Sequence, residues 1–208
     1  MFLTQPTVKI ANVAKGIKVT WSMCDGATGY TVYRSEYDAK TKKWSKWKSR
    51  GTAAATKSSW TDKKVTSGKY YKYTVRAVNG NVKSTYVSSG KLYYLLTPTV
   101  TATAVQNEIK VSWTQSAGAK GYTVYSSQYD PVTNKWSNWS NRGTAKADKS
   151  SWADKKAQAG VKYRYTVRAV NGTVMSSYTS SATIKYNVTP TVKVANASNG
   201  TKVTWSAA

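Results

Sequence analysis

Apolar and polar residues alternate with a period of two along most of the chain. Between residues 16 and 22, Ile17, Val19 and Trp21 alternate with lysine and threonine. The segment from Tyr71 to Ala77 repeats this pattern, with tyrosine, valine or alanine at every second position. A period of two places the apolar side chains on one face of a β-strand. Runs with helical periodicity are absent from the sequence, which therefore predicts an all-β protein.

The whole pattern recurs after 92 residues without a gap. Prolines and tryptophans mark the recurrence, at Pro6, Pro98 and Pro190 and at Trp21, Trp113 and Trp205. A period of this length is the size of a small domain and too long for a solenoid unit. We expect two full copies, residues 5–96 (repeat one) and residues 97–188 (repeat two), followed by the first strands of an incomplete third repeat at residues 189–208.

Each full copy has room for seven strands. Turn signals separate the alternating segments, and Asn79-Gly80 and Asn171-Gly172 are typical of hairpins. In repeat one we expect strands at residues 6–12, 16–22, 29–36, 44–51, 57–61, 69–79 and 82–94, and in repeat two 92 residues later. This pattern predicts two tandem seven-stranded immunoglobulin-like β-sandwiches with Greek-key connections. The two strands of the third repeat lack a covering sheet, so we expect them to be mobile or ordered only by contact with repeat two or another molecule.

Four segments of repeat one resemble fibronectin type III domains. Residues 6–8, 18–21 and 29–33 look like the first three strands of that family, and residues 68–78 look like its sixth. The nearest form is the bacterial one, found in tandem arrays of secreted and cell-surface proteins of Gram-positive bacteria. The resemblance implies that Trp21 and Trp113 are core tryptophans and that Tyr71 and Tyr163 are tyrosine-corner residues.

The net charge is strongly positive, at +24 from 32 basic and 8 acidic residues. Repeat one carries 18 basic and 4 acidic residues, and repeat two carries 12 and 4. The basic residues are spread along the strands, which is typical of a solvated surface but also attracts polyanions. We expect any binding to polyanions to be non-specific, to weaken with salt and to be stronger for repeat one. No specific nucleic-acid partner is indicated.

The residue inventory argues against catalysis. Histidine is absent, and the single cysteine, Cys24, lacks a base and can form no intramolecular disulfide, so it is interpreted as an incidental loop residue. The repeated acids Asp38/Asp130 and Asp62/Asp154 fall in expected turns, where a carboxylate caps the backbone. We therefore predict no enzyme activity, no cofactor and no metal site. No segment is apolar enough for a membrane helix, so membrane insertion is not expected.

Paired tryptophans provide the candidate ligand surface. Trp44 and Trp47 are three residues apart, as are Trp136 and Trp139. Because side chains alternate along a regular strand, one member of each pair should close the core and the other should lie outside. The candidate ligand surface consists of Tyr33, Trp44, Trp47, Arg76, Tyr125, Trp136, Trp139 and Arg168, with one tryptophan of each pair on the outer face. The alternative is that an outer ring covers its own sheet, stacked under a lysine or arginine stem.

Two classes of function fit these features. The first is a non-catalytic spacer or adhesion stalk within a larger secreted or cell-surface protein, whose partners are the neighbouring domains of the same polypeptide. The short connection from Tyr94 to Pro98 favours it, because apolar residues and proline make a semi-rigid linker. The second is an accessory module that binds a polysaccharide or an anionic cell-wall polymer, with a glycoside hydrolase as one parent protein. Both place the chain outside the cell, with its export signal outside this segment.

Overall fold

The computed structural model describes residues 2–188 and 190–206, and within these ranges the regular structure consists of β-strands. Repeat one contains nine of them: β1 (Val8–Val13), β2 (Gly16–Trp21), β3 (Gly29–Asp38), β4 (Lys43–Trp44), β5 (Lys48–Ala54), β6 (Ser59–Asp62), β7 (Lys69–Asn79), β8 (Val82–Lys83) and β9 (Leu92–Tyr94). The predicted all-β class is confirmed.

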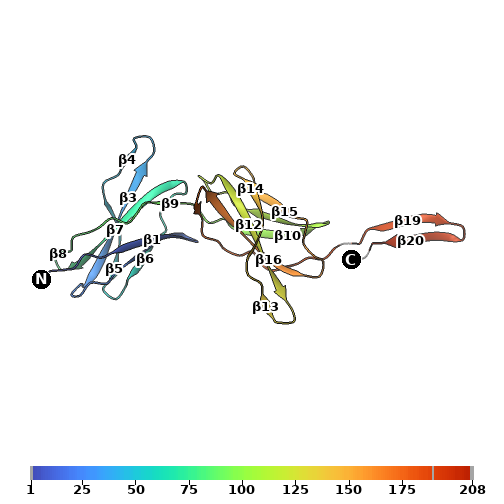
Figure 1. Cartoon of the computed structure of the whole chain (residues 1–208), viewed down its shortest axis with the longest axis horizontal. Helices are drawn as coiled ribbons and strands as arrows, with labels where there is room; N and C mark the ends of the chain where they lie inside the picture. Colours follow the sequence, from blue (N-terminus) through green and yellow to red (C-terminus); the bar gives the residue numbers. More distant parts are fainter. Residues whose placement is uncertain (1, 189, 207–208) are drawn as a thin grey trace. The chain divides into compact units, whose positions relative to one another are not determined.

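The strands of repeat one form two antiparallel sheets (Figure 1). One sheet has the order β1-β2-β6, and the other has the order β4-β3-β7-β8, with β5 also paired to β3 and β9 to β7. The long strands β3 and β7 pair from Gly29↔Val78 to Glu36↔Tyr71 and form the centre of the second sheet. Two stacked antiparallel sheets are the predicted sandwich.

The core of repeat one lies between these sheets and contains the inward residues that alternation predicts. Trp21 is 6% exposed, and its ring centroid lies 5.4 Å from that of Tyr30. Val19 and Val75 are fully buried, as expected for the inner faces of β2 and β7. Cys24 lies in a loop, as expected, but it also belongs to this core, where its thiol donates to the Thr4 carbonyl, so it is a packed residue rather than an incidental one.

The tyrosine corner implied by the family resemblance is present. The Tyr71 hydroxyl accepts a hydrogen bond from the Thr66 amide at 2.9 Å and donates one to the Thr66 carbonyl at 3.3 Å. In repeat two the Tyr163 hydroxyl accepts from the Gln158 amide at 2.9 Å. The corner therefore fixes the loop that enters the long central strand in both repeats.

Repeat two reproduces these strands almost residue for residue at the offset of 92. They are β10 (Val100–Val105), β11 (Glu108–Trp113), β12 (Gly121–Asp130), β13 (Lys135–Trp136), β14 (Ser140–Lys146), β15 (Ser151–Asp154), β16 (Lys162–Asn171), β17 (Val174–Met175) and β18 (Ile184–Lys185). Its sheets have the orders β10-β11-β15 and β13-β12-β16-β17, with β14 paired to β12 and β18 to β16. Trp113 is 6% exposed and packs against Tyr122, as Trp21 packs against Tyr30. The domain limits at residues 96 and 97 stay a prediction.

Two of the expected strands are interrupted. The strand expected at residues 44–51 is divided into β4 and β5, and the strand expected at residues 82–94 is divided into β8 and β9. Between β8 and β9, serine side chains replace the regular ladder: the Ser84 and Ser89 hydroxyls each accept from an amide of β7, at 3.0 Å. Serine competes with regular backbone pairing in this way, which explains why an apparently alternating segment is not one strand.

The third repeat contributes the hairpin β19 (Val192–Ala197) and β20 (Gly200–Trp205), in the register of β1 and β2. Trp205, the counterpart of the core residue Trp21, is 70% exposed. Val194 and Val203 are also exposed. Thr189, Ala207 and Ala208, which belong to the segment 189–208 expected for this repeat, lie outside the described residues.

Candidate functional site

A ladder of aromatic and basic side chains covers the outer face of the second sheet in repeat one. The Lys72 ammonium lies 4.4 Å from the Trp44 ring centroid. The Arg76 guanidinium lies 5.8 Å from the Tyr86 ring, which packs edge-on against Trp47 with 6.1 Å between centroids. Cations over ring faces attract the ring quadrupole. We call Trp44, Lys72, Trp47, Tyr86 and Arg76 the ladder of repeat one.

Repeat two carries the equivalent ladder, built around Arg164 and Arg168. The Arg164 guanidinium lies 4.5 Å from the Trp136 ring and 5.2 Å from the Trp139 ring, so one cation contacts both tryptophans. Arg168 lies 5.8 Å from the Tyr178 ring, and its Nε donates to the Ser176 carbonyl at 2.8 Å. Arg164, which contacts both rings, is not among the residues that the sequence indicated; its lysine counterpart in repeat one is Lys72.

The expected division of each tryptophan pair into one core and one outer ring is wrong. Trp44 and Trp47 are both half-buried, and the buried core of repeat one includes neither. The alternation rule fails because Trp47 lies beyond the end of β4, in an irregular segment that is not bound by the pleat. The half-buried tryptophan that packs against the core is Trp60, on β6.

Tyr33 and Tyr125 are half-buried, and the sequence placed both on the outer face. Tyr33 stands opposite Thr74 in the ladder of β3 and β7, between buried Val32 and Arg34. Thr74 is only 1% exposed, although its neighbours Lys72 and Arg76 belong to the outer ladder. Side chains on the outer face therefore cover their own sheet, which is the alternative that the sequence left open.

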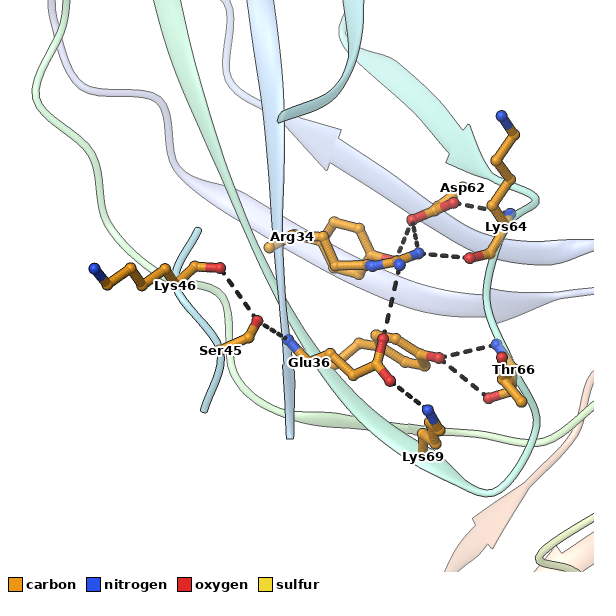
Figure 2. A network of polar contacts seen from close by, with 10 residues as sticks. Arg34, Glu36, Ser45, Lys46, Asp62, Lys64, Thr66 and Lys69 are labelled. Atoms are coloured by element: carbon orange, nitrogen blue, oxygen red, sulfur yellow. Dashed lines mark hydrogen bonds and ion pairs between the residues drawn. The ribbon is translucent and has the colours of Figure 1, made fainter. Parts of the chain in front are cut away.

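A buried carboxylate links the two sheets of repeat one (Figure 2). Asp62 is 2% exposed and accepts from Arg34 Nη1 at 2.8 Å and from the Tyr73 hydroxyl at 2.9 Å. Its other oxygen accepts from the Lys64 amide at 2.9 Å. The expected backbone cap is thus present, but Asp62 also forms a buried ion pair that the turn assignment did not predict. Three hydrogen bonds to charged or polar donors offset much of the cost of burying the carboxylate.

Arg34 also connects this carboxylate to charged residues at the surface beside β3. Its Nη1 donates to the Lys64 carbonyl at 2.6 Å, and its Nη2 lies 3.7 Å from Glu36. Glu36 in turn pairs with the Lys69 ammonium. The Glu36 carboxylate raises the pKa of Lys69, first through the hydrogen bond and then through its charge. Figure 2 shows this sequence of contacts from Asp62 through Arg34 and Glu36 to Lys69.

In repeat two a different arginine neutralises the equivalent carboxylate. Asp154 is 1% exposed and receives two hydrogen bonds from Arg142, Nε–Oδ2 at 3.0 Å and Nη2–Oδ1 at 2.7 Å. The Tyr165 hydroxyl donates to the same carboxylate at 2.9 Å. At the offset of 92, the counterpart of Arg142 is Arg50 and that of Arg34 is Ser126. The two repeats therefore neutralise equivalent buried carboxylates with arginines from non-equivalent strands.

Burial raises the pKa of Tyr73 and of Tyr165 well above the ordinary value of 10.0, and the charge of the neighbouring aspartate raises it further. Both phenols stay protonated in the folded state and serve as hydrogen-bond donors. At the surface, hydrogen bonds from the Lys40 and Thr41 amides lower the pKa of Asp38. This is the turn cap that the sequence predicted for Asp38.

Repeat one also has a groove that sequence reasoning missed. Its volume is 810 Å³, and it is lined by residues of β3, the β3–β4 turn, β5, β7 and β9, including Lys40, Lys48, Arg50, Tyr70 and Tyr93. These residues are far apart in sequence, so no local motif indicates them. A signal was nevertheless available, because several lining positions differ in type from their counterparts 92 residues later.

The described residues include no group of three or more side chains suited to hold a metal ion. In the same ranges, 2–188 and 190–206, no helix has the length and apolar character needed to cross a membrane.

Comparisons with known proteins give the following similarities. No protein-family model matches the chain, and no curated protein matches it. Similar solved structures include a two-domain fibronectin type III segment of chicken tenascin, at 16% identity and a TM-score of 0.43, covering 88% of this chain and 98% of that one. The FN1–FN3 domains of chicken CNTN1 share 15% identity at a TM-score of 0.37, covering 88% and 67%. The alpha chain of the chicken interferon gamma receptor shares 10% identity at a TM-score of 0.46, covering 88% of this chain and 98% of that one. Similarity at this level carries no functional information.

Proposed function

We propose that the chain is a non-catalytic spacer or adhesion-stalk segment of a larger secreted or cell-surface protein. The observation that carries this proposal is the recurrence of the same strands in the same sheet orders at a gapless offset of 92. Repetition of a whole sandwich adds length without adding a new site. The sequence resemblance favours fibronectin type III domains of the kind found in Gram-positive bacteria, and neighbouring domains of the same polypeptide are the proposed partners.

The connection between the repeats supports a spacer. Tyr94 and Leu95, at the end of repeat one, are 2% and 0% exposed, and Pro98 follows them closely. Buried side chains and a proline restrict the conformations of a short connection. A spacer needs this property, because a slack linker would not hold a further domain at a fixed distance.

The test is a distance distribution between fluorophores at Lys57 and Lys149, two exposed positions in different repeats, introduced as cysteines in a Cys24→Ser background. If the chain is a spacer, single-molecule measurements should give a narrow distribution of distances between the two fluorophores. The matched control is the same chain with a Gly-Ser insertion after Leu96, which should broaden the distribution. If the unmodified chain is already as broad as the control, the proposal fails.

The second candidate is a carbohydrate- or polyanion-binding accessory module that uses the ladders and Tyr33 or Tyr125. The ladders favour it because each repeat presents tryptophan rings beside cations. The burial of Thr74 beneath the ladder of repeat one favours a covering role instead. Titration with neutral and acidic polysaccharides, followed by tryptophan fluorescence in the parent and in Trp47→Ala, decides between them. A ligand bound at the ladder loses affinity in the variant.

A further inference from the structure

The groove of repeat one is lined by Arg50, whose counterpart in repeat two, Arg142, pairs with a buried aspartate. Arg142 is 19% exposed and makes both of its hydrogen bonds to Asp154. In repeat one Arg34 contacts Asp62 instead, and Arg50 is exposed and lines the groove. Arg50 also lines a smaller cavity of 360 Å³ beside Asp62 and Trp60. The exchange of arginines therefore leaves the Arg50 guanidinium available at the groove.

Further cations face the same groove. Lys40 and Lys48 are exposed lining residues, and Lys69, which pairs with Glu36, lines the groove as well. Acceptors are interspersed among them: Glu36, Asp38 and Ser45 also line the groove. The groove thus offers several positive donors together with a few hydrogen-bond acceptors. This composition suits a ligand that carries both negative charges and hydroxyl groups.

Three tyrosine rings form an apolar wall of the groove. Tyr70 packs edge-on against Tyr37 with 6.3 Å between centroids and tilted against Tyr93 with 4.8 Å. Tyr70 is 36% exposed, so part of its ring is available at the surface. An aromatic face that is fixed by neighbouring rings is a contact surface for the apolar face of a planar or cyclic ligand.

Repeat two lacks this combination although it has the same fold. At the offset of 92, lysines are replaced by Val132, Ser140 and Val161, and tyrosines are replaced by Lys162 and Lys185. These are the counterparts of Lys40, Lys48, Lys69, Tyr70 and Tyr93, in that order. These groove side chains are not required for the fold, because repeat two adopts it without them.

We propose that the groove of repeat one binds an acidic saccharide, a chain of sugar rings that carry carboxylates. Arg50, Lys48 and Lys40 contact the carboxylates, Tyr70 contacts a ring face, and Glu36 and Asp38 accept from sugar hydroxyls. The two carboxylates favour a saccharide over a nucleic-acid strand, because sugar hydroxyls can donate hydrogen bonds to them, whereas the phosphate oxygens of a nucleic-acid backbone only accept. This site is separate from the ladders and goes beyond the spacer role, which requires no ligand.

The test uses the full chain and a short oligogalacturonate, with its methyl ester as the uncharged probe. The site variant is Lys48→Gln/Arg50→Gln, and the matched control is Lys9→Gln/Lys18→Gln, exposed lysines on β1 and β2 with the same change of net charge. Because hydrogen bonds to charged groups are strong, we expect the affinity for the oligogalacturonate to fall about tenfold or more in the site variant and less than about twofold in the control. Equal losses in both variants would mean diffuse charge attraction and would overturn the proposal, as would equal affinity for the methyl ester.

A second variant separates ring contact from charge. Tyr70→Lys introduces the residue of repeat two and raises the net charge, so attraction by charge alone predicts tighter binding. Contact of the sugar with the Tyr70 ring predicts weaker binding instead, by at least about threefold. Tighter binding of the oligosaccharide by Tyr70→Lys contradicts the site. An oligothymidylate that binds more tightly and depends on Arg50 in the same way would overturn the assignment to a saccharide.

Discussion

Arg34 Nη1 lies 2.8 Å from Asp62 Oδ2, and the two side chains are 6% and 2% exposed. The equivalent carboxylate of repeat two, Asp154, is paired with Arg142 from β14 rather than with a residue of β12. One buried acid is therefore neutralised from either of two neighbouring strands. Because the arginine that is not needed faces the groove, the choice of partner determines the surface of each repeat.

The exchange predicts non-additive effects in repeat one. Arg34→Ser should cost only about 1–2 kcal/mol, because Arg50 can reach Asp62 as Arg142 reaches Asp154. Arg34→Ser/Arg50→Ser should cost about 3–5 kcal/mol, since it leaves a buried charge without a basic partner. Amide exchange of Val75 reports the free energy of opening of repeat one by itself. Arg50→Ser alone serves as the control and should leave the free energy of unfolding nearly unchanged. If the losses of the two single variants simply add up in the double variant, Arg50 does not replace Arg34 as the partner of Asp62.

Alkaline conditions should destabilise both repeats. The folded-state pKa values of Tyr73 and Tyr165 lie above the ordinary 10.0, so the folded state holds these protons longer than the unfolded chain does. The stability that these two phenols contribute is complete when the pH is below their ordinary pKa of 10.0. It declines as the pH rises from there toward the folded-state pKa, by about 1.4 kcal/mol per pH unit for each group.

Urea unfolding measured at increasing alkaline pH tests this dependence. Tyr73→Phe/Tyr165→Phe should be less stable near neutrality, since each change removes a hydrogen bond to a buried carboxylate. The same variant should show a flatter decline above pH 10, because it has lost the two shifted groups. An unchanged slope would exclude these two phenols as the cause.

Tryptophan truncations should separate the core from the ladder. Trp21→Ala should lower the free energy of unfolding, measured by urea denaturation, by about 3–5 kcal/mol, because it opens a cavity between the sheets. Trp44→Ala and Trp47→Ala should each lower the free energy of unfolding by about 1 kcal/mol, the order expected for a surface cation–ring contact at Trp44 and an edge-on ring pair at Trp47. Lys72→Gln provides a control that keeps the Trp44 ring and removes the cation. Losses at Trp44 as large as at Trp21 would show that the ladder is part of the core.

The β3–β4 turn of repeat one contains a strained residue. Lys42 has a φ of 55°, and its counterpart in repeat two is Asn134, also at 55°. Asparagine adopts this left-handed conformation more readily than lysine. Lys42→Asn should therefore stabilise repeat one by about 0.5–1 kcal/mol, helped by the hydrogen bond that Tyr129 donates to Asn134 and that Tyr37 can reproduce. Lys43→Asn, one residue along, should bring no gain.

The hairpin β19–β20 should exchange its amide protons much faster than the equivalent hairpin of repeat two. Val111 is fully buried, whereas Val203, at the same register position, is 49% exposed. An uncovered two-stranded hairpin is marginally stable in water. Exchange measured on a dilute sample compares the two valines directly. Similar protection would show that another surface covers the third hairpin in solution.

The sequence predicts those parts of the fold that depend on regular alternation. Trp21 and Tyr71 lie where the period of two and the family resemblance place them, since both belong to long strands with an inner face. The tryptophan pair was predicted incorrectly because Trp47 lies beyond the end of a strand of only two residues. Side-chain direction outside a regular strand depends on local hydrogen bonds, such as the one that the Glu36 amide donates to the Ser45 hydroxyl, and the hydrophobic pattern does not indicate these bonds.

The candidate sites were predicted less completely than the fold. The rings of the ladders were named from the sequence, but Arg164, which contacts both Trp136 and Trp139, was not, because its strand is distant in sequence. The groove depends on which arginine pairs with Asp62, and either Arg34 or Arg50 is compatible with the sequence. Such a choice is determined by packing in three dimensions.

The unequal lengths of the terminal strands affect how each repeat responds to tension. β9 is joined to β7 by three residue pairs, whereas β1 and β2 share six. Under a pulling force along the chain, the last strand should peel away first and release the rest of its sandwich. An unravelled repeat of 92 residues extends to roughly 300 Å. Each sandwich would then act as a reserve of length that yields before the covalent chain or its attachments break.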